Sequence, residues 1–112
     1  MNNAIIEKLK AGSLHFAETI WPGTEERILL RILNAQDYSE ILIGVENIFK
    51  NIVMTTSNVD DYNAERETWM LFHSISDVAT KTRLFPNVSE LRKCLTPEIK
   101  EILAEELDAL HD

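Results

Sequence analysis

Apolar residues recur at steps of three and four between positions 35 and 53, which is the spacing of one face of an amphipathic helix. The stripe consists of Tyr38, Ile41, Leu42, Val45, Ile48, Phe49 and Ile52. Asn34 precedes it and can cap the helix by accepting a hydrogen bond from the backbone amide of Asp37. Gly44 costs about 1 kcal/mol relative to alanine inside a helix, so we expect either close packing or a weak point there.

A second long helix is predicted to begin near Asp60 or Asp61, after a break rich in Thr, Ser and Asn, and to end near Thr82. One side of it is apolar and consists of Trp69, Leu71, Phe72, Ile75, Val78 and Ala79, whereas Glu65, Arg66, Glu67, Ser74 and Lys81 form the polar side. We expect Trp69 and Phe72 to fill the core, because large aromatic side chains on an apolar helical face are usually buried.

Two shorter helices follow a break at residues 84–87. Asn87 and Glu90 resemble a capping box for a helix over about 88–95. Thr96, Pro97 and Glu98 form a strong helix start, because Thr caps, Pro fits the first helical position and Glu meets the positive end of the dipole. The last helix, 97–111, is expected to direct its apolar residues inward: Ile99, Ile102, Leu103, Leu107 and Leu110.

The first third of the chain fits two structures. Residues 1–13 are treated as a possible flexible segment, although Ile5, Ile6 and Leu9 have helical spacing. Trp21-Pro22-Gly23-Thr24 predicts a type II turn, which requires a positive φ at its third residue. Residues 26–33 fit both an alternating strand and a helical stripe, and periodicity does not decide between them. A hairpin would pair residues 14–21 with 26–33.

Length and charge restrict the class of protein. The 112 residues suit a single domain spanning 1–112. The net charge of −8, without a cluster of Lys and Arg, disfavours binding of nucleic acid. No apolar run has the roughly 20 residues of a membrane span, and a single cysteine excludes an internal disulfide. We therefore expect a protein of the reducing cytoplasm.

The residues that usually carry chemistry are sparse. His15, His73 and His111 have no partner at metal-ligand spacing, and the sequence has no glycine-rich phosphate loop. His73 is expected to be a partly buried histidine with an ordinary hydrogen bond, and Cys94 a buried, inert thiol. We therefore expect no enzymatic activity, no catalytic residues, no metal and no cofactor.

Several segments of the chain resemble the tail assembly chaperones of long-tailed bacteriophages and prophages. The segments that carry this resemblance are Trp21-Pro22-Gly23-Thr24 with residues 28–37, then residues 61–68, 84–91 and 95–99. The resemblance implies a hairpin after Pro22-Gly23, so we expect a mainly helical α+β domain with a short N-terminal β-hairpin and about four helices. A wholly helical bundle is the alternative.

The resemblance also implies a non-catalytic role. Such chaperones bind the tape measure protein, a long and largely helical chain, in the host cytoplasm and are absent from the finished virion. The alternative is a small acidic regulatory or inhibitor protein that binds a basic protein. Chaperone activity requires surplus apolar surface, and we select Trp21, Ile43, Phe49 and Phe85 from their positions as partner-binding candidates. The competing interpretation is that they complete the core or a surface for homo-oligomers.

Overall fold

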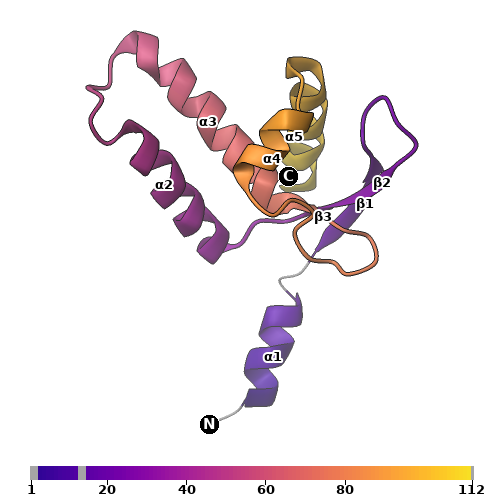
Figure 1. Ribbon diagram of the computed structural model, residues 1–112. Helices are drawn as coiled ribbons and strands as arrows, with labels where there is room; N and C mark the ends of the chain where they lie inside the picture. The colour runs from indigo at the N-terminus through magenta and orange to yellow at the C-terminus, as the bar shows by residue number, and fades with distance from the viewer. Residues whose placement is uncertain (1–2, 13–14, 112) are drawn as a thin grey trace.

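The computed structural model describes residues 3–12 and 15–111, which form a three-stranded antiparallel sheet and five helices (Figure 1). In chain order the elements are α1 (Asn3–Gly12), β1 (Phe16–Ile20), β2 (Arg27–Arg31), α2 (Ala35–Phe49), α3 (Thr56–Ser74), β3 (Ile75–Ser76), α4 (Val88–Cys94) and α5 (Pro97–His111). The expected hairpin with four following helices is confirmed, and the wholly helical alternative is wrong.

The hairpin turns where the sequence predicts. β1 and β2 pair with Phe16 opposite Arg31 and Ile20 opposite Arg27. The amide of Thr24 donates to the carbonyl of Trp21 over 3.0 Å, and Gly23 has a φ of 81°. A type II turn needs this left-handed conformation at its third residue, and glycine adopts it without strain. The Pro-Gly pair therefore fixes the hairpin locally.

The predicted second helix is wrong at both ends, because α3 begins at Thr56 and stops at Ser74. Ile75 and Ser76 instead form β3, whose backbone pairs with Leu30 and Leu29 of β2. The apolar pattern continues beyond Ser74, but pairing with the sheet satisfies the same backbone groups in extended form. Tertiary contact thus overrides the helical pattern after residue 74.

Two other side chains explain how the chain leaves α3. Ser74, predicted on the polar side, is fully buried: its hydroxyl accepts from the Arg31 amide over 3.0 Å and donates to the Arg31 carbonyl over 2.8 Å. Asp77 then starts a turn, because its carboxylate accepts from the backbone amides of Ala79 and Thr80. Val78 and Ala79, predicted inside, are consequently exposed.

The core has two parts. The larger lies between the sheet, α3, α4 and α5, and its buried members are Ile28, Leu30, Leu71, Phe72, Ile75, Val88, Leu91, Leu103 and Leu107. The smaller lies between α2 and α3 and consists of Leu33, Ile41 and Val45. Trp69 and Met70 pack against both parts. The prediction that Trp69 and Phe72 belong to the core is confirmed, and α3 connects its two halves.

The helices α2, α4 and α5 begin directly after the capping residues that the sequence predicts. The side chain of Asn34 accepts from the Asp37 amide and the carboxylate of Asp37 accepts from the Asn34 amide, which completes a capping box. Asn87 caps α4 by accepting from the Glu90 amide over 2.9 Å, and the Thr96 hydroxyl accepts from the Ile99 amide over 3.2 Å. These three predictions depend on local sequence alone: the caps at Asn34 and Thr96 are confirmed, and of the capping box predicted at Asn87 and Glu90 the structure has the bond accepted by Asn87.

The N-terminal helix α1 extends away from the rest of the chain, below the sheet in Figure 1. Ile5, Ile6 and Leu9 are 53%, 41% and 68% exposed. The segment treated as possibly flexible therefore contains a helix, while residues 1, 2 and 13 of it lie outside the described residues. Among the helices described, none has the length and apolar character needed to cross a membrane.

Candidate protein-binding surface

The apolar stripe of α2 is wider than the surface that α3 covers. Ile41 and Val45 are fully buried, and Tyr38 and Phe49 are half-buried. The other three members of the predicted stripe, Leu42, Ile48 and Ile52, are exposed, so their assignment to a buried face is wrong. The reason is geometric: α2 packs against α3 along one edge, and the helix ends at Phe49, before Ile52. Apolar surface is thus left over.

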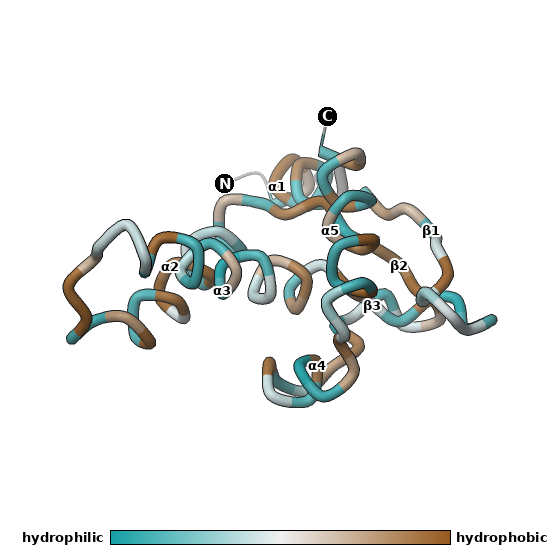
Figure 2. The backbone as a smooth tube through the Cα atoms, turned by 90° about the horizontal axis from the view of Figure 1, so that it is seen from above, coloured by the Kyte–Doolittle hydropathy of each residue, from teal (hydrophilic) through white to brown (hydrophobic). Residues whose placement is uncertain are grey.

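The surplus gathers where α2 is joined to α3. A groove of about 480 Å³, which we name the tip groove, is lined by Glu46, Phe49, Lys50, Ile52, Met54, Val59 and Tyr62. Phe49 and Tyr62 form its floor, with ring centroids 5.4 Å apart. Figure 2 shows hydrophobic colour along this connection. The side chain of Val53 beside it is 82% exposed. An apolar concentration of this kind on a small domain is typical of a binding surface.

Exposed apolar residues also continue from the tip groove along α2. Leu42 and Ile43 are 47% and 61% exposed. They precede Glu46 of the groove by four and three residues, so all three side chains lie on one side of the helix. Of the predicted candidates, Phe49 thus lines the tip groove, and Ile43 lies one helical turn from the groove residue Glu46.

The other two candidates meet elsewhere. Trp21 and Phe85 are half-buried against the larger core, with ring centroids 5.9 Å apart. They line a small apolar pocket beside the hairpin turn, at the opposite side of the molecule from the tip groove (Figure 1). Cys94 lines the same pocket and is exposed, which corrects the prediction of a buried thiol: α4 ends at this residue, and no further turn of helix covers it. The four candidates thus form two separate pairs.

Sequence reasoning missed most of the tip groove. Ile52 was expected inside the core, and Met54 and Val59 fall in a stretch expected to be only a break between helices. One signal was present: seven apolar residues on a single helix cover more than the stripe of about 100° that one neighbouring element buries. Such a surplus indicates surface left for a partner.

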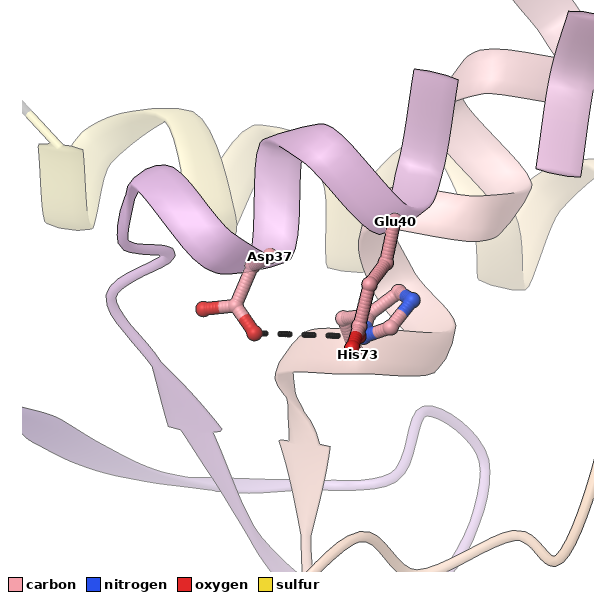
Figure 3. A group of neighbouring side chains, drawn as sticks. All are labelled: Asp37, Glu40 and His73. Carbon is pink, nitrogen blue, oxygen red and sulfur yellow. Dashed lines mark ion pairs between the residues drawn. The ribbon is translucent and has the colours of Figure 1, made fainter. Parts of the chain in front are cut away.

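A polar cluster lies at the other end of α2, where Asp37 and Glu40 approach His73 of α3 (Figure 3). The Nδ1 atom of His73 is 3.9 Å from a carboxylate oxygen of Asp37 and 3.6 Å from one of Glu40. These distances exceed those of hydrogen bonds, so within residues 3–12 and 15–111 the ordinary hydrogen bond predicted for His73 is not seen. His73 is 3% exposed rather than partly buried.

These three side chains have donor atoms close enough for a metal ion, but Asp37 is already engaged. Arg31 donates to both carboxylate oxygens of Asp37 over 2.8 Å, and the amide of Asn34 donates to one of them over 2.8 Å. The guanidinium of Arg31 would repel a cation bound at the same oxygens. The arrangement is that of a buried ion pair which fixes the start of α2 to β2.

The pKa values in this cluster follow from burial and its charges. Burial lowers the pKa of His73, and Arg83 lowers it further, against the opposing effect of Asp37 and Glu40. Burial acts to raise the pKa of Asp37, but hydrogen bonds from Arg31 and from the Asn34 amide outweigh it and hold that pKa below its ordinary value. The cluster therefore favours neutral His73 beside ionised Asp37.

Folding stability is expected to decrease as the pH falls below about 6.5, the ordinary pKa of histidine. In that range the unfolded chain protonates His73 before the folded chain does. The contribution of neutral His73 to the free energy of unfolding is therefore fully present above this pH, and it is lost as the pH falls through the pKa of His73 in the folded chain. Urea unfolding at a series of pH values tests this, with His73→Gln expected to flatten the dependence. The exposed His15→Gln is the control, and an equal flattening by it would contradict the assignment.

Comparisons with known proteins identify no relative: no family model matches the chain, and no curated protein or solved structure matches it either. Function is therefore inferred from the surface itself. Within the described residues, the tip groove and the exposed side of α2 suit the burial of an apolar partner.

Proposed function

We propose that this chain is a non-catalytic tail assembly chaperone of a long-tailed bacteriophage or prophage, which binds the tape measure protein and keeps it soluble during tail assembly. The observation that carries the proposal is the exposed apolar surface of the tip groove, with the exposed Leu42 and Ile43 on the neighbouring turn of α2. The sequence resemblance supplies the class of partner, and the hairpin that it implies is present.

The mode of binding follows from the shape of this surface. A long helical protein that has not yet assembled exposes apolar stripes, which associate with one another. A groove lined by Phe49, Ile52 and Met54 can accept such a stripe by helix-in-groove docking. Each isoleucine or leucine side chain that becomes fully buried contributes about 1.5–3 kcal/mol.

The acidity of the chain supports the same role. Its formal net charge is −8, and the outer side of α5 carries exposed Glu98, Glu101 and Glu105. Several copies bound along one partner would repel each other and keep the complex in solution. In this proposal the charge maintains solubility, and the apolar surface recognises the partner.

Co-expression with a candidate tape measure protein tests the proposal. We expect the wild-type chain to increase the soluble fraction of the partner and to be pulled down with it. Ile43→Glu places a charge on the apolar surface beside the tip groove, and we expect about tenfold or more weaker binding. Ile102→Glu is the matched control, because Ile102 lies on α5 and is 44% exposed, which corrects the expectation that it points inward.

Two results would count against this proposal. The chaperone role fails if wild-type protein changes neither the solubility nor the capture of the partner. The surface assignment fails if Ile43→Glu and Ile102→Glu weaken binding equally.

The acidic regulator is a second candidate, because a groove between α3 and α5 is lined by Glu67, Glu101, Glu105 and Asp108 with a single lysine, Lys100. A basic partner bound there would dissociate as salt is raised, since charge attraction is screened. An apolar partner at the tip groove would tolerate the same salt. Capture at 0.1 and 1 M NaCl therefore separates the two functions.

A further inference from the structure

The helix α1 is too short to be stable alone. It has ten residues, whereas isolated helices of fewer than about 12–15 residues are marginal in water. Its apolar residues Ile5, Ile6 and Leu9 lie on one face, because Leu9 follows Ile5 by four positions and Ile6 by three, and each is more than 40% exposed. Among the described helices and strands, the pairs that pack most closely against each other do not include α1. A helix with these properties requires a packing partner.

The tip groove has the complementary properties. It is open and mostly apolar, with Phe49, Ile52, Met54 and Val59 among its lining residues. In Figure 1 the connection between α2 and α3, whose residues line the groove, lies at the upper left, whereas α1 extends downward from the sheet and points away from this connection. In this fold, α1 is therefore placed to reach the groove of a second copy rather than its own.

Charge favours the same pairing. α1 carries Lys8 and Lys10 against one acid, Glu7, and so has a small positive charge. α2 and α3 are both acidic: α2 contains Asp37, Glu40 and Glu46 without a basic residue, and α3 contains four acids and one arginine. The groove itself is lined by one acid and one base, Glu46 and Lys50. The lysines of α1 would thus approach two helices of net negative charge.

We propose that α1 of one copy of this chain occupies the tip groove of a second copy, with Ile5, Ile6 and Leu9 against the groove residues. If the exchange is reciprocal it gives a two-fold dimer, and if it is not it gives a ring or an open chain. The pairing needs no other protein, so it holds or fails independently of the proposed chaperone function.

The test measures the mass of the purified full-length chain in solution by light scattering after size-exclusion chromatography. We expect wild type and the control Ile102→Glu to associate, and we expect Leu9→Glu in α1 and Ile52→Glu in the groove to lower the association at least tenfold. All three substituted residues are exposed, so circular dichroism should show the same fold. Mixing Leu9→Glu with Ile52→Glu should restore association, because one variant keeps an intact groove and the other keeps an intact α1.

The same measurements identify the results that overturn the proposal. Association of Ile52→Glu alone at the wild-type level would mean that α1 pairs with α1. Association of Leu9→Glu alone at that level would mean that groove pairs with groove. A wild-type chain that remains monomeric up to about 100 µM, or a mixture of the two variants that remains monomeric, would also exclude the exchange.

Discussion

Replacing Asp37 by alanine is expected to lower the free energy of unfolding by about 3–5 kcal/mol. The side chains of Arg31 and Asp37 are 14% and 10% exposed, and the two form a bidentate ion pair at 2.8 Å. Without Asp37 the guanidinium of Arg31 stays buried with no carboxylate, and the Asn34 amide loses its acceptor. Urea unfolding at pH 7 measures the loss, which is a large fraction of the stability of a domain of this size.

The hairpin offers a matched control. Arg27 lies on the same strand as Arg31 and pairs with Glu18 over 3.2 Å, but these side chains are 69% and 46% exposed. Exposed pairs contribute little, so Glu18→Ala is expected to cost less than about 1 kcal/mol. Equal losses for Asp37→Ala and Glu18→Ala would show that Arg31 becomes hydrated when its partner is removed. The combined variant Arg31→Leu with Asp37→Leu should recover much of the loss, because no buried charge remains.

Features that depend on adjacent residues could be predicted from the sequence. The Pro-Gly turn, the cap at Asn34 and the Thr96-Pro97-Glu98 helix start each require only a few consecutive side chains, and the structure has all three. The hairpin itself needed the family resemblance, because the periodicity of residues 26–33 fits a helix equally well. Among these elements, the cap at Asn34 fixes the start of α2, which carries much of the candidate surface.

Features that depend on distant residues could not be predicted. The sequence pattern of α3 continues through Ile75, and only the unpaired edge of β2 explains why the chain becomes a strand there. Arg31 ends β2 and Asp37 lies in the first turn of α2, so their pairing is visible only in three dimensions. For the candidate surface, Ile43 and Phe49 were selected from position, but the exposure of Ile52 depends on where α2 ends.

Replacing Gly44 by alanine is expected to destabilise the fold, although alanine is the better helix former by about 1 kcal/mol. A Cβ atom at residue 44 would lie 2.7 Å from ring carbons of Trp69, closer than such atoms approach. The indole packs against both halves of the core and cannot move without disturbing one of them. Overpacking of this kind costs about 1–3 kcal/mol, so we expect a net loss of up to about 2 kcal/mol and a melting temperature lower by several degrees.

Two further variants separate this clash from a general effect on α2. Asn47→Ala changes an exposed residue of the same helix and should leave stability unchanged or slightly raised. Trp69→Phe removes the ring atoms nearest to residue 44, and among the described residues the indole Nε1 atom has no hydrogen-bond partner to lose. Because the two side chains would touch, Gly44→Ala should cost less in the Trp69→Phe background than alone. Equal costs in both backgrounds would show that the Trp69 ring does not account for the loss, and a rise in stability on Gly44→Ala alone would show that propensity outweighs packing at this position.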